Sequence, residues 1–156
     1  MDPEQNAPQQ LNVSAIRSGT VIDHIRNEYT FKVVEILNLM QEDRMVLIGM
    51  NLPSDKLGRK GLIKIEDREV TPQEINKIAL FAPDATLNII QDYRVVEKRR
   101  VELPESVEGI LRCINPNCVT NQQSVTTDFD VMRSTPPTLR CSYCERVMSG
   151  RDIVLK

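Results

Sequence analysis

The sequence predicts an α+β chain in two parts, an N-terminal ferredoxin-like split β-α-β sandwich followed by a small, cysteine-containing β domain. Two observations support this. The elements expected in the first two thirds follow the order β, α, β, β, α, β, which is typical of an antiparallel sheet with two helices on one face. The four cysteines of the 156-residue chain all lie in its last third, in two pairs.

The length allows one domain or two small ones, and the confinement of the cysteines favours two. Residues 1–10 contain two prolines and several polar amides, so we expect a disordered tail. Residues 11–103 are then expected to form the first domain and residues 104–156 the second. Val101–Ser106, with a proline flanked by acidic residues, is the expected linker.

The first elements follow from local patterns. Gly19–Ile25 reads as a turn that leads into a short strand, which Asp23 and His24 should end. Apolar residues at i, i+3, i+4 and i+7 predict a helix over Asn27–Met40. The short apolar run Arg44–Asn51, followed by Leu-Pro-Ser, predicts a buried strand.

The next elements have clear start and stop signals. A loop containing Pro53 and Gly58 should lead to a strand over Gly61–Glu66. Thr71–Glu74 is a strong helix start, because it offers a threonine N-cap, a proline at the first helical position and a glutamate that can complete a capping box. Pro83 should stop this helix.

The last stretch of the first domain is strand material over Thr86–Val101, interrupted around Gln91–Asp92. Its Asn88 and Tyr93 are polar groups that could contact a base or a ribose. The run Lys98–Arg100 is basic, a pattern that usually marks a solvated surface.

The cysteines of the last third form a C-x4-C pair, Cys113 and Cys118, and a C-x2-C pair, Cys141 and Cys144. Two such knuckles can bring four thiolates to the corners of one tetrahedron, which is the arrangement of structural zinc. We therefore expect a zinc-bound small β domain with one structural Zn²⁺. A segment of about 50 residues rarely has a sufficient core of its own, whereas zinc binding contributes roughly 10 to 16 kcal/mol in zinc-finger peptides.

Other uses of the cysteines stay open at this point. Two disulfides would need an oxidising compartment, although the N-terminus shows no secretory signal. Iron also accepts four thiolates, typically between two near-identical C-x2-C knuckles. A catalytic zinc would need an open coordination position, which four cysteines do not leave. No apolar run approaches the ~20 residues that cross a bilayer, so we expect no membrane contact and a cytoplasmic, reducing location.

Charge patterning suggests one ligand-binding face. Lys60 and Lys64 lie four residues apart on a predicted strand, so they share a face with Leu62 while Ile63 and Ile65 point the other way. Two ammonium groups beside an apolar side chain could hold a polyphosphate and brace a sugar or base. A solvated face explains the same pattern.

Two further classes of function fit the sequence poorly. An enzyme is disfavoured, because His24 is the only histidine and no nucleophile or glycine-rich phosphate loop is evident. Next to Asp23, this histidine could contact a ligand or simply bond to its neighbours. A nucleic-acid binder is disfavoured by the net charge of −2 and by the few basic and aromatic residues between the cysteines. Those residues are Arg133, Arg140, Phe129 and Tyr143.

From Leu11 to Lys156 the sequence resembles the regulatory chain of aspartate carbamoyltransferase. The resemblance rests on GTVIDHI at Gly19–Ile25, IGMNLPS at Ile48–Ser54, GRKGLIKIE at Gly58–Glu66, LFAPDATLN at Leu80–Asn88 and the two cysteine knuckles. It implies a non-catalytic subunit whose N-terminal allosteric domain binds nucleoside triphosphates, CTP and ATP with UTP as a further candidate. It also implies a zinc domain that docks on the catalytic chain, and a homodimer of regulatory chains.

The resemblance also implies positions for both sites. The nucleotide site would comprise Ala15, Ile16, Val21, Asp23, His24, Lys60, Leu62, Lys64, Asn88, Ile90, Tyr93, Val95 and Lys98. Contacts to the catalytic chain would come from Asn115 and Asn117 in the first knuckle. The implied mechanism is linkage, in which an effector that binds one quaternary state better shifts the whole assembly toward that state.

Overall fold

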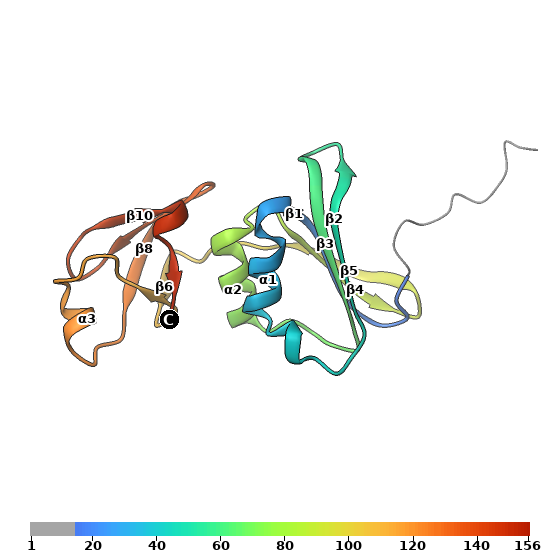
Figure 1. Cartoon of the computed structure of the whole chain (residues 1–156), viewed down its shortest axis with the longest axis horizontal. Coiled ribbons are helices and arrows are strands. Elements are labelled where there is room, and N and C mark those ends of the chain that lie inside the picture. Colours follow the sequence, from blue (N-terminus) through green and yellow to red (C-terminus); the bar gives the residue numbers. More distant parts are fainter. Residues whose placement is uncertain (1–14) are drawn as a thin grey trace, which may run out of the picture.

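The computed structural model describes residues 15–156, which form two lobes (Figure 1). The expected tail, residues 1–10, lies outside the described residues. The first lobe contains β1 (Gly19–Arg26), α1 (Thr30–Ile36), β2 (Val46–Ser54), β3 (Gly58–Glu66), α2 (Pro72–Phe81), β4 (Thr86–Gln91) and β5 (Arg94–Arg100), with 3-10 turns at Asn27–Tyr29 and Leu39–Gln41.

The five strands form one sheet in the order β2-β3-β1-β4-β5, and every neighbouring pair is antiparallel. The first four strands and two helices have the split β-α-β arrangement, and β5 extends the sheet through a hairpin with β4. Both helices cover the face of the sheet that is turned toward the second lobe (Figure 1). The predicted α+β class is confirmed.

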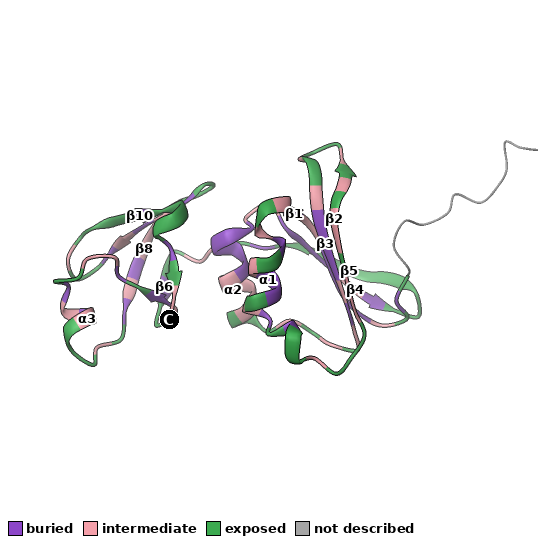
Figure 2. Cartoon of the chain, in the orientation of Figure 1, coloured by how far each residue is buried: buried purple, intermediate pink, exposed green. Residues whose placement is uncertain are grey.

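Alternation along the strands divides the sheet into two unlike faces. Ile22, Ile63 and Leu87 are almost fully buried against helix residues such as Val33 and Ile78. This is the main core, seen as the buried layer between sheet and helices (Figure 2). The opposite side, here called the open face, carries a smaller apolar cluster of Ile16, Val21, Leu62 and Ile90, with Leu52 packed against it.

Two bulges interrupt this alternation. Between Ile22 and Ile25, β1 has one residue more than β3, and β2 has the same surplus between Gly49 and Leu52. In each bulge one non-glycine residue has left-handed backbone dihedrals, with φ of 55° at His24 and 58° at Asn51. The expectation that the first strand ends at Asp23 and His24 is therefore wrong, because the bulge carries β1 on to Arg26.

Gly61 of β3 lies opposite both bulges. A Cβ atom on this residue would overlap the hydroxyl and carbon atoms of the Thr30 side chain at the start of α1. That threonine is fully buried and donates its hydroxyl to the carbonyl of Asn27 over 2.9 Å. A glycine here lets the first helix begin directly against the sheet.

The predicted helix over Asn27–Met40 is too long. A 3-10 turn precedes α1, and Asn38 ends the helical segment with φ of 54°, a conformation that asparagine tolerates better than most residues. Met40, which was expected on the buried side, is 86% exposed.

The predicted loop around Pro53 and Gly58 is also too long. Pro53 lies within β2, where it pairs with Arg59, and Gly58 opens β3. Because β2 is at the edge of the sheet, a residue without an N–H group can face outward at no cost to the ladder. The later hairpin turns through Asp92 and Tyr93, whose φ values of 48° and 63° are typical of a two-residue type I′ turn.

The start of α2 is as predicted. The Thr71 hydroxyl accepts a hydrogen bond from the Glu74 N–H (3.2 Å), and the Glu74 carboxylate accepts one from the Thr71 N–H (2.9 Å), so the capping box is complete. Pro72 occupies the first helical position.

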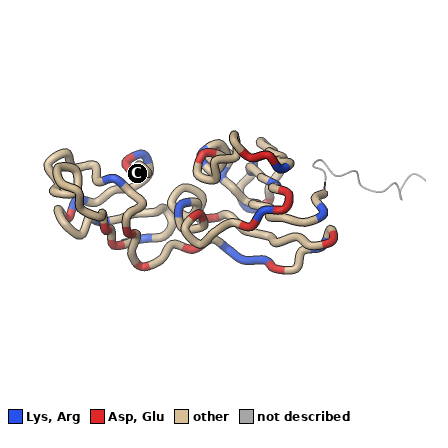
Figure 3. The backbone as a smooth tube through the Cα atoms, turned by 90° about the horizontal axis from the view of Figure 1, so that it is seen from below, with Lys and Arg blue, Asp and Glu red and all other residues tan. Residues whose placement is uncertain are grey.

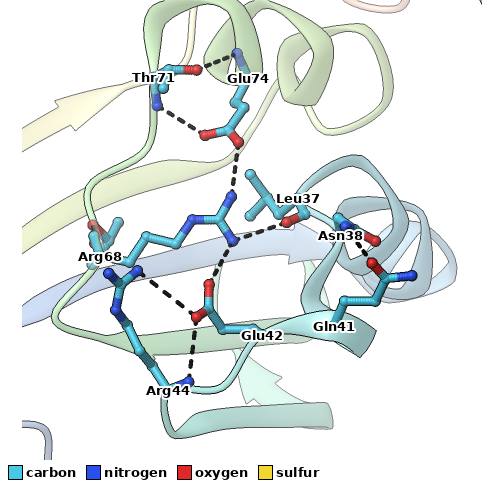
Figure 4. A network of polar contacts seen from close by, with 9 residues as sticks. Leu37, Asn38, Gln41, Glu42, Arg44, Arg68, Thr71 and Glu74 are labelled. Atoms are coloured by element: carbon cyan, nitrogen blue, oxygen red, sulfur yellow. Dashed lines mark hydrogen bonds and ion pairs between the residues drawn. The ribbon is translucent and has the colours of Figure 1, made fainter.

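Arg68 connects this helix start to the segment after α1 (Figure 4). Its guanidinium donates to Glu74 (2.8 Å), to Glu42 (3.1 Å) and to the carbonyl of Leu37 (2.9 Å). Hydrogen bonding from the backbone N–H of Arg44, together with the positive charges of both arginines, lowers the pKa of Glu42. One half-buried guanidinium thus connects the end of α1 to the start of α2.

The second lobe consists of short strands around its own core. It contains β6 (Ser106–Glu108), β7 (Leu111–Arg112), α3 (Val119–Gln122), β8 (Asp128–Ser134), β9 (Pro137–Cys141), β10 (Val147–Ser149), a 3-10 turn (Gly150–Asp152) and β11 (Val154–Leu155). One sheet has the order β10-β9-β8-β6, and β11 pairs with β7. Phe129, Leu139 and Met148 are fully buried between them.

The lobes share part of their packing. Leu80 and Phe81, at the C-terminal end of α2, belong to the same buried cluster as Phe129 of the second lobe. The Phe81 ring also lies 6.3 Å from that of Tyr29. A cavity of about 250 Å³ opens beside them, lined by residues of both lobes. Within residues 15–156, no helix has the length and apolar character needed to span a bilayer.

Candidate functional site

A row of predicted site residues crosses the open face. The strand registers pair Lys64 with Val21, Val21 with Asn88, and Asn88 with Lys98. Directly paired residues of antiparallel strands point to the same face, so these four side chains from β3, β1, β4 and β5 lie next to one another. The sequence suggests the two lysines of β3 but not this alignment.

Asp23 organises the charges at the β1 bulge. Its carboxylate pairs with the Lys60 ammonium at 2.8 Å and accepts a hydrogen bond of 2.6 Å from the His24 N–H. The His24 ring is 2.9 Å from the Thr86 hydroxyl on β4. Burial lowers the pKa of Lys64, and the negative charge of Asp23 opposes that shift. The bulge thus brings together Asp23, His24 and Lys60, three residues of the predicted nucleotide site.

Asn88 is unusual at the centre of the row. Its side-chain oxygen is buried and has no hydrogen-bond partner among residues 15–156. A buried acceptor without a donor costs roughly 1 to 3 kcal/mol, so native structures rarely keep one without a reason. The atom is a ready acceptor for a ligand that brings its own donor.

The apolar cluster begins at the hairpin end of the open face with Ile90 and continues through Val21 of the central row to Leu62, opposite the β1 bulge. Ile16, Val21, Leu62 and Ile90 are each between 3% and 9% exposed. Around them Ala15 and the residues of the β4–β5 hairpin, Tyr93 (66% exposed) and Val95 (56% exposed), are open to solvent. The Tyr93 N–H donates to the carbonyl of Arg17 over 2.9 Å, which joins the segment before β1 to this hairpin.

A basic pocket occupies the other end. It has a volume of about 290 Å³, and its lining residues are His24, Lys56, Thr86, Lys98, Arg99 and Arg100. The last three form the longest continuous blue stretch in Figure 3. Of this set only His24 and Lys98 were predicted. The basic run of β5 was a signal for Arg100, which pairs with Thr86, but no local pattern indicated Lys56.

The two ends are far enough apart for an elongated ligand. Thr86 and Ile90 are four residues apart on β4, about 13 Å at roughly 3.3 Å per residue. A molecule with an apolar, planar head and a polyanionic tail would place the head on the cluster and the tail in the basic pocket, with Asn88 and Lys64 between them.

The second lobe contains the metal site. Cys113 follows β7, Cys118 precedes α3, Cys141 ends β9 and Cys144 lies in the turn before β10. Their sulfur atoms all lie within 4.8 Å of one another, and none forms a disulfide. The Cys113–Cys144 and Cys118–Cys141 sulfurs are 3.6 and 3.8 Å apart. A tetrahedral ion with Zn–S bonds of ~2.3 Å needs sulfurs ~3.8 Å apart, so the four thiols fit a single structural zinc.

The thiols differ in their environments. Burial raises the pKa of Cys113 to about 12. Burial also acts on Cys144, but hydrogen bonds from the Arg146 backbone N–H and the Asn115 side chain outweigh it and lower the pKa of that thiol to about 7. Zinc displaces protons from such thiols, so metal binding is coupled to pH.

The first knuckle uses its asparagines differently. The Asn115 side chain accepts a hydrogen bond from the Asn117 N–H (3.1 Å), and the Asn121 amide donates to the carbonyls of Cys113 (2.8 Å) and Asn115 (2.7 Å). Asn115 is half-buried and holds the loop in shape, whereas Asn117 is exposed.

Fold and site together define a class of protein, a two-domain α+β chain whose smaller domain is organised by a four-cysteine metal site. Two family models match it. One, the allosteric domain of the aspartate carbamoyltransferase regulatory chain, covers residues 11–102, and the other, the metal binding domain of the same chain, covers residues 105–154. The chain belongs to the family of aspartate carbamoyltransferase regulatory chains and is a non-catalytic subunit.

Curated members of this family are similar over nearly their whole length. The aspartate carbamoyltransferase regulatory chains of Pyrococcus abyssi and Pyrococcus horikoshii are 54% and 53% identical over 147 residues, covering 93% of this chain and 97% of each relative. That of Porphyromonas gingivalis is 49% identical, covering 94% of this chain and 97% of the relative.

The metal site gives the first prediction. The purified chain should contain about one zinc, because four thiolates satisfy one tetrahedral ion. Cys141→Ala should lose the metal and unfold the second lobe, as measured by elemental analysis and by hydrogen exchange of β8 and β9. Zinc should also be released as the pH falls, because protons compete for the thiolates.

Ser142→Ala is the matched control. This exposed neighbouring side chain bonds only to the side chain of half-buried Asp128, so the variant should keep its zinc and its fold. A folded second lobe in metal-free Cys141→Ala would contradict a structural role for the ion.

Proposed function

We propose that this regulatory chain binds nucleoside triphosphates, CTP and ATP with UTP as a further candidate, on the open face of its sheet and passes their effect to the catalytic chains. The observation that carries the proposal is the buried, unpartnered oxygen of Asn88, placed between an apolar cluster and a basic pocket. A nucleotide supplies a planar head for the apolar cluster, hydrogen-bond donors for Asn88 and phosphates for the basic pocket.

The charges support phosphate rather than a neutral ligand. The lining of the basic pocket contains four cationic side chains and no carboxylate. Lys64 adds a half-buried cation, whose lowered pKa reflects partial removal from water. A bound polyanion would compensate this density of positive charge.

The proposed mechanism is linkage. The open face points away from the second lobe, and the helix layer lies between them (Figure 1). A bound nucleotide on that face does not reach the metal domain directly, so it can act only by favouring one arrangement of the chain over another.

We further propose that the metal domain provides the surface that docks on the catalytic chain. The first knuckle projects from the metal site, and Asn117 offers an exposed amide there. Asn115 would contribute from the same loop, largely by holding its shape.

A homodimer of regulatory chains is supported by the outer edge of β2. Met45, just before this strand, is 44% exposed, and Ile48, within it, is 42% exposed. Among residues 15–156, β2 pairs with β3 alone. Unpaired edges with apolar side chains favour strand pairing between copies, whereas the charged β5 edge discourages it. The cluster of reduced thiols favours a reducing compartment, so the cytoplasm is the proposed location.

The nucleotide site predicts that Lys64→Ala weakens CTP and ATP binding about tenfold or more, since a charge-assisted contact contributes roughly 1.5 to 3 kcal/mol. The measurement is calorimetric titration of the chain assembled with its catalytic chains, at fixed salt and magnesium. Lys77→Ala, on α2 behind the sheet, is the control and should bind normally. Unchanged binding in Lys64→Ala would remove this lysine from the site.

The docking proposal predicts that Asn117→Ala weakens association with the catalytic chains about three- to tenfold, the loss expected for one neutral hydrogen bond. Sedimentation of mixed subunits measures it. Zinc content should stay unchanged, which separates docking from damage to the metal site. Equal association of the variant and the unaltered chain would place the contact elsewhere.

The dimer proposal predicts that Ile48→Lys shifts the isolated regulatory chain from dimer to monomer, because a charge would be placed in an apolar edge contact. Val96→Lys places the same charge at a 54% exposed position on the opposite edge strand. This variant should keep the mass of the dimer in solution. Light scattering after gel filtration distinguishes them, and a dimer that survives Ile48→Lys would exclude pairing through β2.

A further inference from the structure

We propose that Lys56 is the residue that distinguishes ligands by the length of their phosphate chain. The inference rests on the proposed nucleotide site and adds a determinant of specificity to it. Lys56 lies outside the strands, in the short turn 55–57 between β2 and β3. The Ser54 hydroxyl accepts a hydrogen bond of 3.1 Å from the Leu57 N–H and closes this turn.

The turn brings Lys56 to a pocket whose other lining residues come from β1, β4 and β5. His24 comes from β1, Thr86 from β4, and the remaining lining residues from β5. Lys56 is thus the only lining residue supplied by the β2–β3 hairpin. It closes the basic pocket at the side away from β5.

The charge in the pocket is largely uncompensated. Arg99 pairs with Glu97 at 3.1 Å. In the part of the chain that the structure describes, Lys56, Lys98 and Arg100 have no carboxylate partner within ion-pair distance. Cations held this close repel one another, and the repulsion is relieved only when an anion enters.

The strand registers order these cations along the path of the ligand. Lys98 pairs with Asn88, in the central row, whereas Arg100 pairs with Thr86, two residues further toward the pocket. That step is about 7 Å. A phosphate attached to a nucleoside on the apolar cluster would meet Lys98 first, and only a longer chain would extend to Arg100 and Lys56.

Nucleotides with one and three phosphates therefore separate the roles. The test is titration of CMP, CTP and inorganic tripolyphosphate into the assembled holoenzyme carrying unaltered chain, Lys56→Gln or Arg59→Gln, at fixed salt and magnesium. Arg59 is an exposed cation three residues away and outside the pocket lining, so its variant controls for the general loss of charge.

Lys56→Gln should weaken CTP and tripolyphosphate about tenfold, the effect of one charge-assisted contact, and leave CMP within about twofold. Arg59→Gln should leave all three ligands within about twofold. Equal weakening of CMP and CTP by Lys56→Gln, or no weakening at all, would overturn the inference while leaving nucleotide binding intact. Lys56-dependent binding of tripolyphosphate without any binding of CTP or CMP would support Lys56 and overturn the nucleotide function. If none of the three probes binds the unaltered holoenzyme, both fail.

Discussion

The open face depends on two β-bulges, one in β1 and one in β2, that shift the in-and-out alternation of the side chains. With strict alternation along β1, the residue after Asp23 would point into the core and Ile25 would point out. The extra residue in the bulge restores Ile25 to the core, where it is fully buried, and leaves Asp23 and His24 at the open face. The left-handed backbone of His24 costs about 1 to 3 kcal/mol. The bonds to Asp23 and Thr86 hold it there.

The parts of the structure that have local sequence signals could be predicted. The capping box of α2, the alternation along β3 and the cysteine spacing each specify their structure within a few residues, and the family resemblance supplied the predicted set of nucleotide-site residues. The bulges were not foreseen because their left-handed residues, His24 and Asn51, are not glycines. The overlong helix failed similarly at Asn38. The basic pocket could not be read either, since Lys56 and Arg100 meet only after the sheet has closed.

The open face and the contact between the lobes lie close along the same strands, although they are on different sides of the sheet. His24 and Arg26 are two residues apart on β1, and Asp84 lies two residues before Thr86, the first residue of β4. The His24 ring is 2.9 Å from the Thr86 hydroxyl at the basic pocket, and Arg26 forms an ion pair of 3.0 Å with Asp84 next to the interlobe cavity. A shift of β1 against β4 at the first pair would be felt at the second.

The shared cluster at the end of α2 has a consequence for the history of the chain. Leu80 and Phe81 precede the linker in sequence, yet they pack with the core of the metal domain. A recombination event that cut at the linker would separate these two side chains from the partners that bury them. The recombined protein would then expose an apolar surface. The two domains are therefore a poor pair for shuffling among unrelated proteins. Substitutions on either side of the contact would instead be accepted in compensating pairs, so that the halves descend together.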